Sequence, residues 1–277
     1  MNASSLPYTV LLLLAELAVG GLAVMTIFDA RGAVTRGYIK AGALTVVPLA
    51  LLAGWTLASI SPTDDVGGYS LSEGWFIPAR IAVAAFVLLS GAHLVAALRE
   101  QAALGVRLGI AASIAGVLVL GAVGMMVAPS AWSAWGVVGS IVAAAALLGS
   151  ALMAMMWGHW YLTSGRLPKE PMEQMSLLVF GAVLVQTVFV LLALLAPARE
   201  VPLSESSFGV GLGGNPAFWL RILVGLVFPA LLAWLAWRTA RIRGMMSATG
   251  LLYIALGALL AGEVLARGLL FSTGQAV

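Results

Sequence analysis

Long apolar stretches alternate with short polar breaks along the whole chain. Each stretch is close to the about 20 residues that a helix needs to cross the about 30 Å hydrocarbon core of a bilayer. Because lipid offers backbone groups no hydrogen-bond partner, such stretches must fold as helices. The pattern predicts an all-α, polytopic membrane protein with eight transmembrane helices, at approximately 7–28, 40–60, 76–98, 107–128, 132–157, 175–196, 217–238 and 248–270.

Basic residues gather in alternate connections between these stretches. Ten of the fourteen lie in the odd-numbered connections: Arg31, Arg36, Lys40, Arg99, Arg107, Arg166, Lys169, Arg238, Arg241 and Arg243. The even-numbered connections are mainly acidic and carry Asp64, Asp65, Glu73, Glu200 and Glu205, with Arg199 as their clear cation. By the positive-inside rule, the odd connections are cytoplasmic and both termini lie outside.

Composition supports the membrane assignment and excludes several chemistries. The 277 residues are 62% hydrophobic and 9% charged, with a mean hydropathy of +1.06, which no soluble domain shows. The absence of cysteine excludes disulfides, thiolate-bound iron–sulfur clusters and cysteine zinc sites within this chain. No Lys or Arg precedes the first apolar stretch, so we expect a retained helix there and not a cleaved signal peptide.

Two segments at corresponding places suggest an internal repeat. The third predicted helix begins WFIPARIAVAAF and the seventh begins AFWLRILVGLVF. This alignment places Arg80 and Arg221 near the outer starts of their helices, each after a long outer loop, Ser61–Trp75 or Ala198–Pro216. We therefore expect two four-helix halves, 1–129 and 130–277, related by a parallel repeat.

A few polar side chains fall inside the predicted helices, where charge is costly unless paired or hydrated. They are Glu16, Arg80, Gln186, Arg221, Glu263 and Arg267. Glu263 and Arg267 are four residues apart, hence on one helix face. Two interpretations stay open: the pair pins the last helix into its bundle, or it lines a site for a polar head group or a proton.

The stretch around this pair, LAGEVLARGLLF, resembles the closing segment of the membrane-anchor subunits of bacterial dimethyl sulfoxide reductases. Those subunits belong with the wider polysulfide-reductase (NrfD-like) anchors. The resemblance implies eight helices in a bacterial cytoplasmic (inner) membrane, exchange of electrons with menaquinone or ubiquinone, and an iron–sulfur partner subunit. Through that partner it implies a molybdopterin-type catalytic subunit, so this chain would not carry the terminal catalytic centre.

In the wider anchor family the quinone binds in the N-terminal half, close to the outer face. Candidate quinone-binding or proton-handling residues here are Glu16, Arg80 and Trp75, and Glu16 would act with Arg80 if the first and third helices adjoin. The dimethyl sulfoxide reductase anchors carry a His-Leu-Gly-Ser-Pro stretch after the second helix, where this chain has ASISPTDDVGGYSLSEGW. Arg80 could alternatively extend its guanidinium to the membrane surface.

Three other hypotheses remain. His93 and His159 lie near the cytoplasmic ends of the third and fifth helices, so two imidazoles at matching depth could bind one haem b; interfacial hydrogen bonding would equally explain them. A small-molecule or ion transporter is compatible with Glu16 near mid-membrane and with the repeat. The third hypothesis is a purely structural assembly subunit.

Overall fold

The computed structural model describes residues 3–164, 167–196 and 212–277. Arg166 and most of the predicted outer loop Ala198–Pro216, with Arg199, Glu200 and Glu205, lie outside these residues. The long helices are α1 (Leu6–Ala30), α2 (Arg36–Ser59), α3 (Phe76–Leu98), α4 (Ala102–Met126), α5 (Ala134–Ser164), α6 (Glu170–Leu195) and α9 (Met245–Thr273). Another span combines α7 (Pro216–Ile222), a π-helix (Leu223–Val227) and α8 (Phe228–Arg241).

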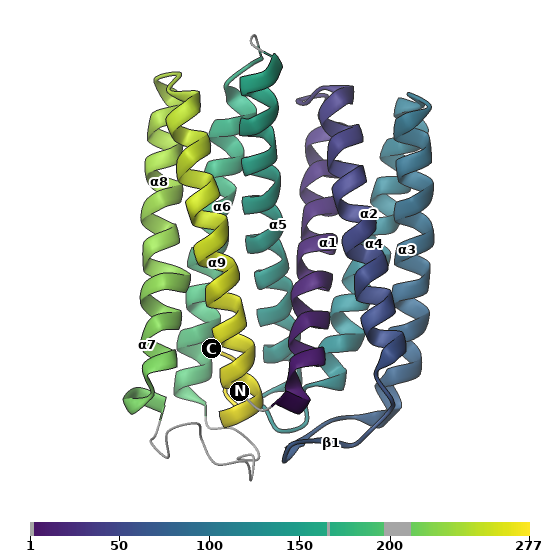
Figure 1. The fold of residues 1–277 in the computed structure, drawn as a ribbon, viewed down its shortest axis with the longest axis vertical. Coiled ribbons are helices and arrows are strands. Elements are labelled where there is room, and N and C mark those ends of the chain that lie inside the picture. Colours follow the sequence, from purple (N-terminus) through teal and green to yellow (C-terminus); the bar gives the residue numbers. More distant parts are fainter. Residues whose placement is uncertain (1–2, 165–166, 197–211) are drawn as a thin grey trace.

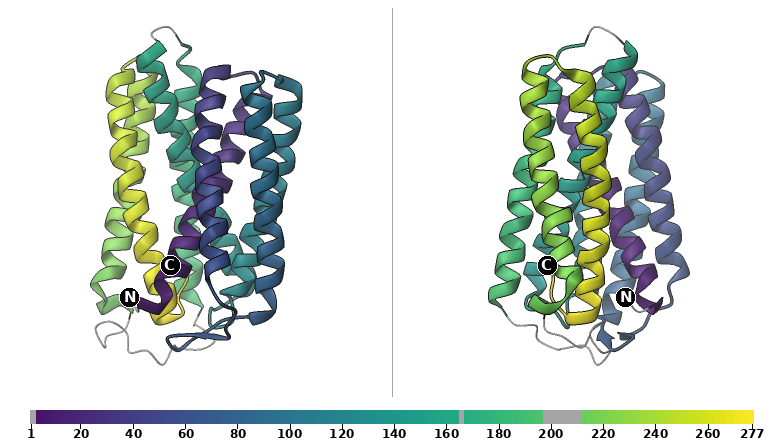
Figure 2. Two further views of the ribbon diagram at one scale, coloured as in Figure 1. Left: turned by 45° about the vertical axis from the view of Figure 1, so that its right-hand side comes forward. Right: turned by 60° about the vertical axis from the view of Figure 1, so that its left-hand side comes forward.

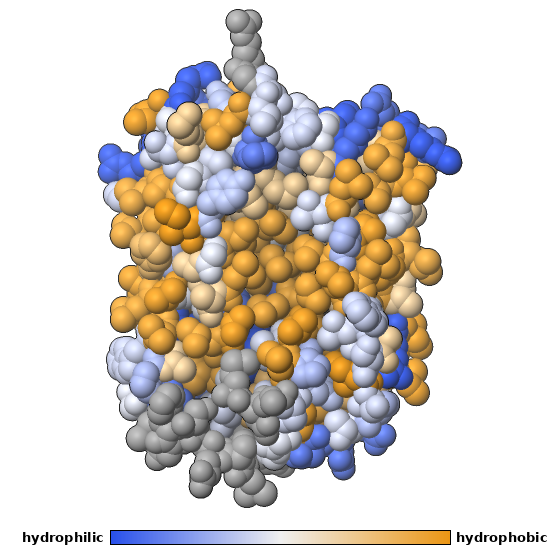
Figure 3. All heavy atoms as spheres, in the orientation of Figure 1, coloured by the Kyte–Doolittle hydropathy of each residue, from blue (hydrophilic) through white to orange (hydrophobic). Residues whose placement is uncertain are grey.

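Eight helices of the described chain are long and apolar enough to cross a membrane. Each lies on one of the eight predicted spans, so the prediction of an all-α polytopic fold is confirmed. Some helices are longer than predicted. Helix α5 continues to Ser164, whereas the sequence pattern placed its end at 157. Apolar side chains cover the middle of the bundle, and hydrophilic ones gather at its two ends (Figure 3).

The helices form two neighbouring groups (Figures 1 and 2). In the first group, each of the helices α1 to α4 contacts the next one, and α1 also contacts α4. In the second group, α5, α6, α8 and α9 contact one another in that order, and α5 also contacts α9. The groups meet mainly along α1 and α5. Gly20 of α1 and Gly149 of α5 touch through their backbones there, and a Cβ on either would overlap the other helix. Small residues permit this approach, which drives helix association in lipid.

The loop between α2 and α3 contains structure that the sequence pattern did not predict. Residues Asp65–Val66 (β1) and Tyr69–Ser70 (β2) form a short antiparallel pair, joined by Gly67 and Gly68, whose φ angles are +62° and +86°. Two consecutive residues with positive φ are typical of a tight hairpin turn. Tyr69 anchors the hairpin, because it is buried and its hydroxyl donates to the Val127 carbonyl at 2.5 Å.

Both termini lie at the same end of the bundle as this hairpin (Figure 1). The connections α1–α2, α3–α4 and α8–α9 lie at the opposite end (Figure 1), and they carry or adjoin most of the described basic residues. The structure therefore separates a basic end from a terminal end. The positive-inside rule predicts that the basic end is cytoplasmic.

Candidate functional site: a buried charge network and two membrane-facing grooves

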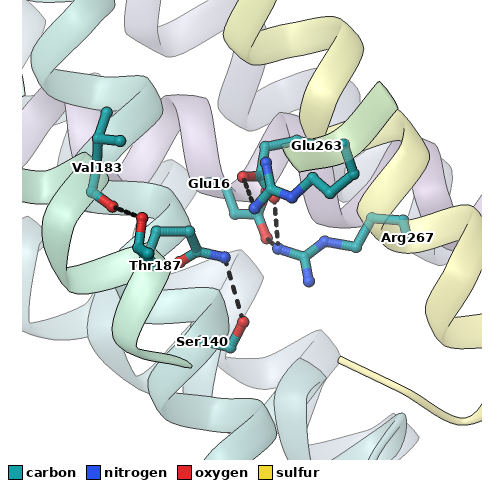
Figure 4. A network of polar contacts seen from close by, with 8 residues as sticks. Glu16, Ser140, Val183, Thr187, Glu263 and Arg267 are labelled. Carbon is teal, nitrogen blue, oxygen red and sulfur yellow. Dashed lines mark hydrogen bonds and ion pairs between the residues drawn. The ribbon is translucent and has the colours of Figure 1, made fainter. Parts of the chain in front are cut away.

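Four charged side chains from three parts of the chain meet inside the bundle. We call Glu16, Arg221, Glu263 and Arg267 the charge network. Arg267 Nη2 donates to Glu16 Oε1 and also to Glu263 Oε2, the latter at 3.2 Å (Figure 4). Arg221 Nη2 forms an ion pair with Glu263 Oε1 at 2.9 Å. All four residues are at most 1% exposed, so the predicted Glu263–Arg267 pair exists as part of a larger cluster.

The network joins the two groups of helices. Glu16 comes from α1, Arg221 from α7, and Glu263 and Arg267 from α9. Glu16 is the tenth residue after Leu6, about 15 Å along the helix from the terminal end of the bundle. Two carboxylates face two guanidiniums, so the ionised cluster is formally neutral. Charges taken out of water are tolerated only with such close pairing.

Arg221 enters the network beside an irregular part of its span. The π-helix Leu223–Val227 follows immediately, and the Phe228 N–H donates to the Leu223 carbonyl within it. Pro229 has no N–H to continue regular α-helical bonding, which favours a change of hydrogen-bond register just before it. Gly225 and Gly262 also face each other closely: a Cβ on Gly225 would lie 2.7 Å from the Gly262 Cα.

Gln186 of α6 extends this polar region toward α5. Its side chain is fully buried. With its amide turned so that the oxygen faces a donor, that oxygen accepts from Arg221 Nη2 at 3.1 Å. The amide nitrogen then donates to the Ser140 backbone carbonyl at 3.2 Å. Without this turn, the amide nitrogen donates to the Ser140 hydroxyl at 3.4 Å. Gln186 and Arg221, which the sequence identified only as isolated polar candidates, therefore act together.

Hydrogen bonding in the network is incomplete within the described residues. Glu16 Oε2, Arg267 Nε, and Arg221 Nε and Nη1 are buried and have no hydrogen-bond partner there. Buried polar atoms without partners are rare and costly in native proteins. An acceptor and several donors are thus available in one place, which suits proton or water chemistry as well as a structural role.

Arg80 lies elsewhere, so the expected approach of Glu16 to Arg80 is wrong. Glu16 pairs with Arg267, whereas Arg80 Nη2 donates to the Ile60 carbonyl at the end of α2, at 2.7 Å. Arg80 lines a groove of about 460 Å³ between α2 and α3, which we call the α2–α3 groove. Apolar residues make up the rest of its wall, among them Val83 and the 71% exposed Trp55.

Trp75 lines a different groove on another side of α3. This groove has a volume of about 690 Å³ and runs between α3, α4 and the start of α5, with Trp135 as its second tryptophan. Its other lining residues are apolar, including Leu118 and Met125. The structure thus distributes the three predicted quinone residues over three places: Glu16 in the charge network, Arg80 in the α2–α3 groove, and Trp75 here.

The two histidines do not fit a shared haem. His93 is buried in the first group of helices, where its Nδ1 lies 2.9 Å from the Gly105 carbonyl of α4. His159 is exposed near the basic end of α5, and its Nδ1 lies 3.4 Å from the Tyr253 hydroxyl of α9. The two imidazoles face different helices, so the geometry does not support them as axial ligands of one haem b.

Sequence reasoning missed two features of these sites. Trp55 was not among the candidate residues, although it forms part of the α2–α3 groove. Asp29 is 3% exposed near the basic end of α1 and forms an ion pair with Arg36 at 2.5 Å. Its position at the end of an apolar stretch, seven residues before an arginine, was the available signal.

Comparison with known proteins adds no family assignment. No protein-family model matches the chain, and no curated protein matches it. The resemblance of the α9 stretch to dimethyl sulfoxide reductase anchors therefore stays a prediction.

Proposed function

We propose that this integral membrane protein is the anchor subunit of a respiratory oxidoreductase complex. In this proposal it exchanges electrons between the quinone pool and an iron–sulfur partner subunit. The α2–α3 groove is the observation that carries the proposal. It combines a guanidinium, an exposed indole and an apolar wall near the terminal end of the bundle. These are the groups that a quinone head and its isoprenoid tail require.

Arg80 would position the head group. One of its Nη atoms is engaged by the Ile60 carbonyl, while Nε has no hydrogen-bond partner among the described residues. A guanidinium carries several fixed donors and no acceptor, so it suits a quinone carbonyl oxygen. Menaquinone or ubiquinone supplies a two-electron, two-proton couple when bound. The side chains of the groove would hold the ring and exclude water from it.

The neighbouring loop gives electrons a short route to a partner. Ile60, which accepts from Arg80, directly precedes the loop Ser61–Trp75. The hairpin in that loop is held against the bundle by Tyr69 and by the Ser72 N–H, which donates to the Met126 carbonyl at 2.9 Å. Because the chain has no cysteine, the clusters would belong to the partner, and a molybdopterin-type subunit would bind beyond it.

Quinone retention tests the role of Arg80. The chain is purified from menaquinone-containing membranes, and bound menaquinone is extracted and quantified. Loss of a hydrogen bond from a charged donor costs about 1.5–3 kcal/mol, so Arg80→Ala should weaken binding by roughly 10- to 150-fold. Arg99→Ala, an exposed arginine outside the groove, is the matched control. Equal retention by the two variants would exclude the α2–α3 groove as the quinone site.

Crosslinking tests the partner. A photoreactive residue at Ser61, which is exposed, should capture an iron–sulfur subunit when the native complex is isolated. The same residue at Gln101, exposed at the basic end, should not. Capture from Gln101 alone would place the partner on the opposite side and contradict the proposed route.

A transporter is the second candidate, and the charge network favours it. The network combines a buried carboxylate that has an unpartnered oxygen, Glu16, with an arginine beside a π-helix, Arg221. Such a polar cluster between two groups of helices resembles the polar sites of transporters. Reconstitution separates the candidates. Proton or solute flux across liposomes without any partner, abolished by Glu16→Gln, would support transport. Quinol oxidation that requires the partner and Arg80 would support the anchor.

A further inference from the structure

The basic end of α8 has the chemistry of a lipid headgroup site. Arg238 and Arg241 line a hollow of about 420 Å³ together with Thr239 and Ile242. Arg243 follows in the short connection to α9, and all three arginines are exposed. We propose that this arginine site, Arg238, Arg241 and Arg243, binds the phosphate group of an anionic phospholipid. The proposal is independent of the quinone site, which lies on α2 and α3.

Two of the arginines are held in place by aromatic rings. The Arg238 guanidinium lies over the Trp234 ring at 5.1 Å, and the Arg241 guanidinium lies over the Trp237 ring at the same distance. Each pair is spaced by four residues, hence on one face of the helix. Stacking fixes a planar guanidinium while leaving its N–H edge free. Less side-chain entropy is then lost when a phosphate binds.

No carboxylate neutralises the site within the described residues. Two other cations at this end are paired: Arg36 with Asp29 at 2.5 Å, and Lys40 with Glu100 at 2.6 Å. Lys169 approaches the arginine site through its Nζ, which donates to the Arg241 carbonyl at 2.8 Å, and pairs with Glu173. None of the three arginines has such an ion pair in the described chain. Their charge is therefore available to an external anion.

The surroundings of the site select a lipid over a soluble anion. Ile242 is 81% exposed and Met246 is 75% exposed, so apolar side chains flank the guanidiniums. Trp234 and Trp237 lie on the preceding turns, where an interfacial aromatic belt is expected. The site occurs at the end that charge distribution predicts to be cytoplasmic, and anionic lipids are abundant in that leaflet. The arginines would therefore bind the phosphate of the lipid, and the apolar side chains would contact its acyl chains.

Lipid binding to the purified, detergent-solubilised chain tests the proposal. Native mass spectrometry compares phosphatidylglycerol with phosphatidylcholine of the same acyl chains. Each interfacial basic residue contributes about 5-fold in affinity for an anionic lipid, so the double variant Arg238→Gln/Arg241→Gln should bind phosphatidylglycerol about 25-fold more weakly. The control is Arg99→Gln/Arg107→Gln, which removes two exposed arginines from the same end. It should change binding less than 2-fold.

Two further variants and a competitor complete the test. Trp234→Leu/Trp237→Leu keeps the charges but removes the stacking, and should bind phosphatidylglycerol several-fold more weakly. This variant also tests the proposal if the arginine variant does not fold. Inorganic phosphate at millimolar concentration should not displace the lipid. Equal binding of both lipids, equal loss in the two arginine variants, full affinity in the tryptophan variant, or displacement by phosphate alone would each overturn the proposal.

Discussion

Removal of the Glu263 carboxylate is the most informative perturbation of the charge network. Glu263 lies between both arginines, 2.9 Å from Arg221 and 3.2 Å from Arg267. In Glu263→Gln, Arg267 keeps its ion pair with Glu16, but Arg221 retains only uncharged amides, those of Gln186 and of the new glutamine, as close partners. Leaving one buried charge without its partner costs about 3–5 kcal/mol. We expect a loss of this size in the free energy of unfolding.

The choice of second mutation then identifies which charge was left unpaired. Arg221→Met in the Glu263→Gln background removes that charge and leaves the Glu16–Arg267 pair intact, so stability should largely recover. Arg267→Met also restores neutrality, but it separates Glu16 from its guanidinium and leaves Arg221 unpaired. The sequence alone paired Glu263 only with Arg267, which would make Arg267→Met the rescuing mutation. The structure predicts that Arg221→Met rescues better.

Tryptophan fluorescence during heating provides the assay, because the chain contains nine tryptophans. A loss of 3–5 kcal/mol corresponds to a midpoint lowered by roughly 10 °C for a protein of this size. Recovery of folded chain from membranes is measured in parallel. Better rescue by Arg267→Met would refute the assignment of Arg221. Normal stability of Glu263→Gln with slowed quinol oxidation would instead assign Glu263 to proton handling.

Two other predictions follow from the fold. Because the chain has no cysteine, a single introduced cysteine can be labelled without background. Ser61→Cys should react with an impermeant maleimide added outside the cell. Ser164→Cys should react only after the membrane is permeabilised. The reverse result would invert the topology. Gly149→Ala should cost about 1–3 kcal/mol in stability, because its methyl group would overlap the Gly20 backbone. Gly91→Ala in α3 is the control, because a Cβ added there has no heavy atom within 4 Å, and it should be neutral or slightly stabilising. Equal melting temperatures for the two variants would contradict the close packing of α1 against α5.

Sequence patterns predicted the spans well because hydrophobic length is a local property. Lipid permits only helices at these positions, so composition within a window of about 20 residues decides the outcome. The hairpin at Asp65–Ser70 was missed, because its strands are two residues long and depend on the burial of Tyr69 against α4. Helix ends were also inaccurate, because a helix can continue beyond the apolar core, as α5 does to Ser164.

The candidate site shows where such local reasoning stops. Glu263 and Arg267 were paired correctly because an i, i+4 spacing fixes their relation on one helix. Glu16 and Arg267 are 251 positions apart, and nothing in a single sequence indicates that α1 and α9 meet. Glu16 was therefore assigned to Arg80 of the same predicted half, where the family resemblance implies the quinone. Partner choice between helices depends on packing, and here the contacts of α1 with α5 and α9 determine it.

Arg80 and Arg221 illustrate how corresponding sequence positions can acquire different roles. Both lie near the start of a helix that follows a long predicted outer loop, and this correspondence was the basis for expecting a repeat. Arg221 is 0% exposed and paired with Glu263, whereas Arg80 faces a membrane groove and bonds to a backbone carbonyl. The neighbouring helix decides the difference: α9 presents a carboxylate to Arg221, while α2 presents Trp55 and apolar residues to Arg80. We propose the quinone site at Arg80 because its guanidinium has no counter-ion among the described residues and lies in the wall of the α2–α3 groove.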